Sequence, residues 1–264
     1  MTNLLSNIVV STILRFGMMD GHDMAEYCHL DNLNDILLID RTVVIEMQAE
    51  AVLWKYGFID GGFLSYSLPA REGVGFYPFR QDYVYCYGMQ YKVFRLGLFN
   101  GCYHSLGPDM RDLPFPKVDC AQEEIYFEAK NPKINLLSNI ITASGSWRAG
   151  YFFGHRLVEY DSSDSLLRVN IPPTAHLDCR AEINFGKYFF LQGGVYLYSL
   201  PVVKLSSIFR AHYSFGAGLQ CENYRLVLSH ECIQPLAYNV TIPSFTHVDD
   251  ANWLLYIQGE FGKK

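Results

Sequence analysis

Apolar and polar residues alternate one by one along most of this chain, and the period of about 3.6 residues that marks helices is almost absent. Between residues 43 and 53 the odd positions are apolar, whereas Glu46, Gln48 and Glu50 occupy even positions. The stretch 79–91 alternates in the same way, with aromatic residues on one face and charged or small residues on the other. A period of two predicts β-strands that have one apolar and one polar face.

This alternating pattern occurs twice. The stretch 42–69, TVVIEMQAEAVLWKYGFIDGGFLSYSLP, returns at 174–201 as TAHLDCRAEINFGKYFFLQGGVYLYSLP, 132 positions later. The segment Asn3–Ile8 likewise recurs as Asn135–Ile140. The chain of 264 residues is therefore predicted to be a single domain, 1–264, built from internal repeats 1–132 and 133–264.

Six strands are expected in each half. They cover roughly residues 4–17, 42–56, 58–68, 79–91, 93–103, 121–130, 135–153, 174–187, 189–200, 209–221, 223–233 and 250–261. Long connections follow the first, third and fifth strands of a half, and the other connections are tight turns. An even number of strands, joined alternately by long loops and tight turns, is typical of a transmembrane β-barrel.

On these features the chain resembles bacterial outer-membrane barrels as a class, over nearly its whole length. The last strand, Asn252–Phe261, resembles the closing strand of such proteins, although Gly262-Lys263-Lys264 follow the final aromatic residue. The resemblance implies an all-β fold, a closed antiparallel up-and-down transmembrane β-barrel of about twelve strands. It also implies a location in the bacterial outer membrane, contact with membrane lipid and long loops that face outward.

Composition narrows the possible partners. Charged residues make up only 18% of the chain, against about 25% in an ordinary soluble domain. With a net charge of -6 and no basic stripe, nucleic acid is a poor partner hypothesis. No apolar run approaches 18 residues, so no transmembrane helix is expected. The apolar segment 4–14 is interpreted as a strand, and an export signal is expected to have been removed or lost.

Seven cysteines, an odd number without a CxxC pair, indicate neither a zinc site nor a disulfide framework. No cofactor is expected.

Alternation does not say which face lies inside. A soluble barrel would point its apolar row inward, and a membrane barrel points that row at lipid. The apolar rows here are almost free of charge, and the opposite rows carry Gly, Ser and both signs of charge. Twelve strands would also enclose too much volume for side chains to fill. These observations favour lipid contact; two soluble barrels in tandem that bind an apolar ligand are the alternative.

On the membrane interpretation, the polar rows line the lumen. The candidate lumen residues are Arg15, Glu46, Glu50, Arg80, Asp82, Arg95, Arg148, Asp178, Arg180, Glu182, Arg210, His212 and Arg225, together with Glu128. Strand direction places Arg15 beside Glu46 and Arg95 beside Glu128. The charges either form a constriction that selects small solutes or form salt bridges that merely replace hydration.

A Gly-His-x-x-x-Glu-Tyr motif occurs in both halves, with His22 and Glu26 in the first and His155 and Glu159 in the second. A His and a carboxylate four residues apart could bind a metal or exchange a proton if the loop turned helically. A duplicated motif at a strand end more often folds the loop back, so no metal site is assigned.

Catalytic signals are weak. The chain has no G-x-S-x-G, and the pairs His104-Ser105 and Ser229-His230 have no visible orienting acid. Outer-membrane barrels nevertheless include hydrolases whose Ser and His face lipid. The preferred hypothesis is a non-enzymatic barrel, either a narrow channel for small solutes or a surface-exposed structural protein. A barrel that hydrolyses lipid is the third hypothesis, after the soluble tandem barrel.

Overall fold

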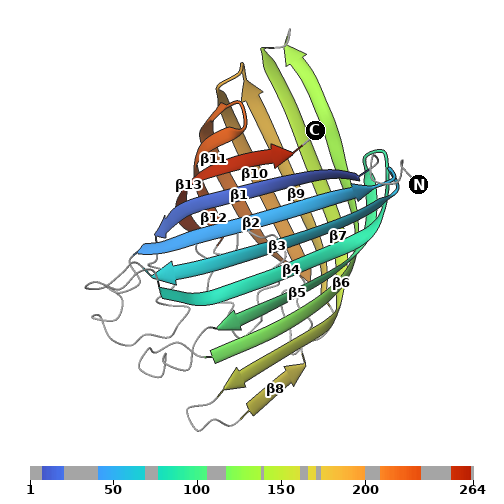
Figure 1. Cartoon of the computed structure of the whole chain (residues 1–264), viewed down its shortest axis with the longest axis vertical. Helices are drawn as coiled ribbons and strands as arrows, with labels where there is room; N and C mark the ends of the chain where they lie inside the picture. Colours follow the sequence, from blue (N-terminus) through green and yellow to red (C-terminus); the bar gives the residue numbers. More distant parts are fainter. Residues whose placement is uncertain are drawn as a thin grey trace.

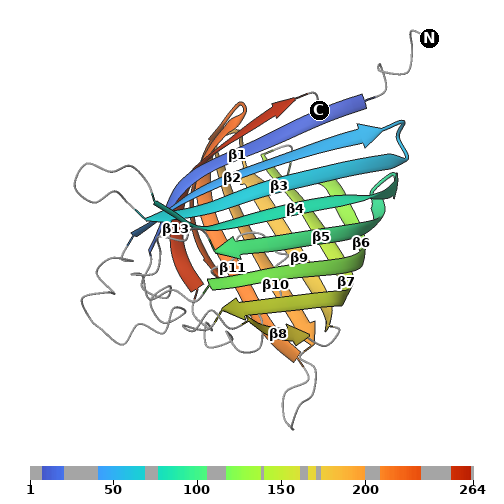
Figure 2. The same ribbon diagram turned by 60° about the horizontal axis from the view of Figure 1, so that its bottom comes forward.

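The computed structural model describes residues 8–20, 41–68, 77–105, 117–137, 140–160, 166–170, 174–199, 209–232 and 251–262. Nearly all of these residues lie in strands (Figures 1 and 2). The strands are β1 Ile8–Asp20, β2 Arg41–Leu53, β3 Gly57–Leu68, β4 Tyr77–Tyr91, β5 Phe94–Ser105, β6 Lys117–Leu137, β7 Ile141–Tyr160, β8 Leu166–Asn170, β9 Thr174–Phe185, β10 Phe189–Ser199, β11 Phe209–Cys221, β12 Tyr224–Cys232 and β13 Ala251–Gly262. Within these ranges, no helix is long and apolar enough to cross a membrane.

The strands form one antiparallel sheet that closes on itself. Neighbouring strands follow the order β6-β5-β4-β3-β2-β1-β13-β12-β11-β10-β9-β7-β8, and an additional pairing of β6 with β7 completes the ring (Figure 1). The short strand β8 and the strand β9 pair with successive stretches of the same edge of β7, so together they fill one position. The described strands therefore occupy twelve positions, and the predicted closed up-and-down barrel is confirmed.

Two features of the strands differ from the prediction. The strand β8 was not predicted; residues 171–173, which separate it from β9, are Ile-Pro-Pro, and proline has no N–H to donate to a ladder. The strands β6 and β7 are also longer than predicted, with 21 and 20 residues. Beyond Ala129, β6 pairs with β7 alone, so the β6–β7 hairpin extends past the rest of the rim (Figure 1).

Related strands of the two halves pair in the same register. Arg15 of β1 lies opposite Glu46 of β2. At the corresponding positions 133 and 132 residues later, Arg148 of β7 lies opposite Asp178 of β9. The β5–β6 and β12–β13 pairs also share one register, and Arg95 and Arg225 occupy equivalent positions in these two pairs. The organisation into one domain with two internal repeats stays a prediction, with which this register agrees.

The apolar row of each strand faces outward. Along β12, Leu226 and Leu228 are 45% and 48% exposed, whereas Val227 is buried at 1%. The exposed apolar residues recur on all twelve barrel strands. A continuous apolar exterior of this kind is what a bilayer contacts, and in water it would be an aggregation site. This orientation contradicts the alternative of soluble barrels that hold an apolar ligand between inward-facing apolar rows.

Large aromatic side chains gather at the rim of tight turns, which we call the turn-side rim; the opposite end is the loop-side end. Trp54, Tyr56, Tyr91, Tyr188 and Tyr224 are all at least half exposed there. Amphipathic aromatic rings are enriched where a barrel crosses a membrane–water interface. The turn-side rim therefore marks one boundary of the lipid-facing band.

Candidate functional site: the charged lumen

The predicted lumen residues alternate with the outward apolar row. Eleven of the fourteen candidate lumen residues have described side chains, and they are Arg15, Glu46, Glu50, Asp82, Arg95, Glu128, Arg148, Asp178, Arg180, Glu182 and Arg225. For Arg80, Arg210 and His212 only the backbone is described, in β4 and β11. Their functional role stays a prediction.

The duplicated loop motif cannot be located in the same way. His22 and Glu26 lie outside the described residues. His155 and Glu159 lie in β7, but their side chains are not described. Among the described residues, no group of three or more His, Cys, Asp or Glu is placed to hold a metal ion.

Arg95 forms an ion pair across the inner wall of the barrel. Its Nη1 and Nη2 each donate to one oxygen of the Glu50 carboxylate at 2.7 Å. Arg95 belongs to β5 and Glu50 to β2, so the pair passes over β3 and β4. The guanidinium carbon of Arg95 lies 4.8 Å from the centre of the Phe58 ring on β3. This cation–π contact stabilises the position of the arginine side chain.

The second half contains the same arrangement. Arg225 donates to the two oxygens of Glu182 at 2.7 and 3.2 Å. Its guanidinium lies 4.7 Å from the centre of the Phe190 ring. These three residues are the repeat equivalents of Arg95, Glu50 and Phe58. We call the two ion pairs, Arg95–Glu50 and Arg225–Glu182, the crossbars.

Both predicted neighbours lie opposite each other, but only one of these placements gives an ion pair. Arg15 donates to Glu46 at 2.9 Å, as expected, and its Nε also donates to Gln258 at 2.7 Å. Arg95 and Glu128 are opposite each other on the backbone of β5 and β6. The Arg95 side chain nevertheless binds Glu50 instead, because a long side chain on a concave wall can reach past its immediate neighbours and the Phe58 ring supports it there.

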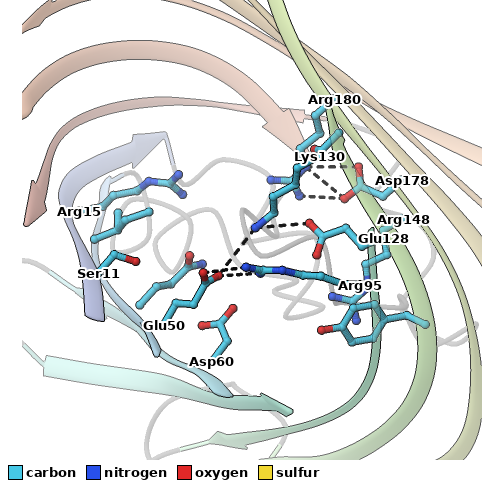
Figure 3. Close-up of a pocket in the computed structure, with 14 residues that line it drawn as sticks. Ser11, Arg15, Glu50, Asp60, Arg95, Glu128, Lys130, Arg148, Asp178 and Arg180 are labelled. Atoms are coloured by element: carbon cyan, nitrogen blue, oxygen red, sulfur yellow. Dashed lines mark hydrogen bonds and ion pairs between the residues drawn. The ribbon is translucent and has the colours of Figure 1, made fainter. Parts of the chain in front are cut away.

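A cavity of about 240 Å³ opens between these charges, toward the turn-side rim (Figure 3). Four carboxylates and five basic groups line it: Glu50, Asp60, Glu128 and Asp178 with Arg15, Arg95, Lys130, Arg148 and Arg180. Ser11, Ile13, Gln48, Tyr126 and Ser146 complete the lining. The near balance of opposite charges fits a water-filled polar space better than a pocket for an apolar ligand.

Two cavity residues are weakly paired. The Lys130 Nζ lies 3.8 Å from Glu50 and 3.6 Å from Glu128, beyond good hydrogen-bond length. Asp60 makes no hydrogen bond or ion pair within the described part of the chain. Their charged ends are therefore the groups most available to a solute that enters the cavity (Figure 3).

Deeper in the barrel, toward the loop-side end, the inward side chains are buried. They include Val44, Leu64, Asp82, Phe99, Glu124, Phe152, His176, Ser229 and Leu254, from nine strands. We call these residues the buried layer. The lumen is therefore densely packed at this level, and a solute that crosses it must pass between these side chains.

At the level of the buried layer, Glu124 and His176, which were not predicted as site residues, form a network with the predicted lumen residue Arg148. Arg148 donates through Nε to Glu124 at 3.1 Å, and Glu124 also bonds His176 Nε2 at 2.8 Å. The guanidinium of Arg148 lies 3.5 Å from the centre of the Tyr126 ring. We call Glu124, Arg148 and His176 the polar niche.

The Ser229-His230 pair does not form a catalytic dyad. Ser229 is fully buried and points into the barrel, whereas His230 is on the outward face. The His230 ring packs against Phe215 and Trp253, at centroid distances of 5.1 and 4.8 Å. Successive residues of a strand face opposite sides, so neither side chain can act on the other. The side chains of His104 and Ser105 are not described.

Comparisons with known proteins add little. No family model matches the sequence, and no curated protein matches it. Among solved structures, a NanC porin overlaps with a TM-score of 0.45 at 7% identity, covering 96% of this chain and 100% of that one. Salmonella typhi OmpF in complex with daunomycin gives 0.39 at 9% identity, covering 96% and 97%. The β domain of the Bordetella autotransporter BrkA gives 0.39 at 12% identity, covering 97% and 99%. At such scores the likeness carries no conclusion, and the closed barrel is established by its own strand pairing.

Proposed function

We propose that this protein is a bacterial outer-membrane barrel that provides a narrow passage for small polar solutes. The observation that carries the proposal is the charge-lined cavity of about 240 Å³ inside a closed barrel whose exterior is apolar. An apolar exterior places the barrel in lipid, and a polar interior allows hydrated solutes to enter it. Closed barrels of this type occur in outer membranes, which gives the location.

The charges of the cavity favour small solutes over strongly charged ones. Because acidic and basic side chains alternate around the wall, a solute that carries one sign of charge meets both attraction and repulsion within a few ångströms. Neutral polar molecules and zwitterions avoid this conflict, and for a small monovalent ion the attraction and the repulsion nearly cancel. We therefore expect weak ion selectivity and a low size limit.

The crossbars define the width of the passage on this proposal. Each one lays an arginine side chain along the wall and holds it by two hydrogen bonds and a ring contact. Paired in this way, the arginine cannot swing across the lumen without breaking charge-assisted hydrogen bonds. The crossbars would thus keep the passage narrow and constant in width.

Single-channel recording in planar bilayers tests the proposal. Protein refolded in detergent should give discrete conductance steps, and a boiled sample in the same detergent should give none. Removing both crossbar arginines, R95A with R225A, should raise the step size. A folded barrel that gives no steps in any of these forms would contradict the channel and support the surface-exposed structural protein.

A further inference from the structure

The two halves of the barrel differ at the polar niche. Glu124 of β6 has Leu254 of β13 as its repeat equivalent, and His176 of β9 has Val44 of β2. Leu254 and Val44 are 5% and 4% exposed, so their places in the barrel wall are as buried as the niche. The same pair of positions is therefore polar in one sector of the lumen and apolar in the opposite sector.

A third position follows the same rule. Tyr196 of β10 is the repeat equivalent of Leu64 of β3, which is fully buried. The Tyr196 ring lies 5.3 Å from the ring of His176, so it belongs to the wall of the niche. We call Val44, Leu64 and Leu254 the apolar sector.

The apolar sector shows which side chains the same fold can bury at the positions equivalent to the polar niche. Burying a carboxylate with an arginine and a histidine costs desolvation free energy that their mutual attraction only partly returns. The apolar sector shows that this fold fills the equivalent space with aliphatic side chains. The polar niche is therefore not needed to close the barrel, and its polarity calls for another explanation.

The niche also contains an unsatisfied polar atom. Both side chains of the Glu124–His176 bond are fully buried. An ionised carboxylate only accepts hydrogen bonds, so the proton of this bond sits on His176 Nε2. The Nδ1 atom of His176 is buried and has no hydrogen-bond partner within the described residues. A buried polar atom of this kind normally forms a hydrogen bond with water or with a ligand.

The niche is continuous with the cavity. Arg148 lines the cavity and also binds Glu124, so it belongs to both. On β9, Asp178 lines the cavity and His176, two residues further on the same face, lies behind it. A row of polar side chains thus leads from the turn-side rim along β6, β7 and β9 into the buried layer.

We infer that solutes cross the buried layer off the barrel axis, along the wall formed by β6, β7 and β9, and that the polar niche is the selective step. The inference rests on the proposed channel function. A solute or water molecule that passes this point forms a hydrogen bond with His176 Nδ1 and then moves on to the next polar group. Val44, Leu64 and Leu254 have no hydrogen-bonding side chain, so the proposed route does not pass between them.

The route is tested by replacing niche residues with the residues at the equivalent positions of the other repeat. The variant E124L/H176V makes the niche resemble the apolar sector, and V44A/L254A enlarges the opposite sector as the matched control. We expect single-channel conductance in KCl to fall by about tenfold or more in E124L/H176V, because aliphatic groups then replace the carboxylate and the imidazole at the crossing. Conductance of V44A/L254A should change by less than about twofold, because the two substitutions add space but no polar group.

Folding is read for each variant from the mobility of unboiled and boiled samples on a gel. If E124L/H176V does not fold, the conductance of H176V alone tests the route, because this variant keeps the Arg148–Glu124 ion pair. Unchanged conductance in the folded variant, or a rise in V44A/L254A alone, overturns the off-axis route while the channel itself stands. Absence of conductance in the unmodified protein refutes the proposed function instead.

Discussion

Neutralising Glu50 probes the charge of the cavity most sharply. Glu50 lines the cavity, whereas its repeat equivalent Glu182 makes the same bidentate ion pair but is not among the lining residues. The exposure of the paired side chains is similar, 11% and 23% for Arg95 and Glu50 against 20% and 19% for Arg225 and Glu182. The variants E50Q and E182Q therefore remove the same charge from two comparable ion pairs, only one of which faces the cavity.

Coulomb's law gives the size of the effect. A unit charge roughly 6 Å from a passing ion in water contributes about 0.7 kcal/mol, which is about threefold in local ion concentration. Loss of the Glu50 charge disfavours cations and favours anions by that factor each, so the cation-to-anion permeability ratio should fall by about tenfold at low ionic strength. Each variant should also lose about 1 kcal/mol of stability, because a charge-assisted pair becomes weaker.

Reversal potentials measured across a bilayer under a KCl gradient give the ratio directly. The expected result is a large shift in E50Q, a smaller one in E182Q and nearly equal urea midpoints for the two. Equal shifts in the two variants, or none in E50Q, would refute the assignment of the cavity to the passage. High salt should reduce the shift, because the Debye length falls below the width of the lumen.

Three further predictions follow from the orientation of side chains. Met47 faces outward and Gln48 inward, so M47K should lower the free energy of unfolding in lipid vesicles by about 2–4 kcal/mol and Q48K by much less; similar losses would argue against the assigned faces. A Cβ at Gly150 would overlap the carboxylate and imidazole that cross over it, so G150A should abolish the niche bond and destabilise the barrel, as urea titration would show; an unchanged midpoint would contradict the crossing. A lipophilic maleimide should label the exposed Cys179 in vesicles but reach the buried Cys86 only after unfolding; mass spectrometry that finds both labelled in the folded protein would speak against this.

Much of the fold could be predicted because the barrel repeats a simple local rule. Alternation within each strand determines which side chains share a face, and each strand pattern can be checked against its copy in the other repeat. The strand β8 escaped prediction because the prolines at 172 and 173 interrupt the alternation between it and β9. The full length of the β6–β7 hairpin depends on pairing beyond the rim, which no local pattern records.

The site was predicted less completely. Opposed strand positions correctly gave the Arg15–Glu46 contact, because these two side chains meet directly across neighbouring strands. The Arg95–Glu50 crossbar spans three strand spacings, so it depends on the curvature of the barrel rather than on sequence neighbours. Glu124 carried a usable signal that was overlooked: it is a charged residue where its repeat equivalent, Leu254, is apolar.

The central claim is that the chain closes into a barrel whose apolar face contacts lipid and whose charged face lines the interior. Gel mobility of the refolded protein, with and without boiling and with and without detergent, tests it most directly. The account predicts a faster-migrating unboiled band that forms only in detergent or lipid and disappears on boiling. A monodisperse protein in plain buffer, with no change of mobility on boiling, would contradict it.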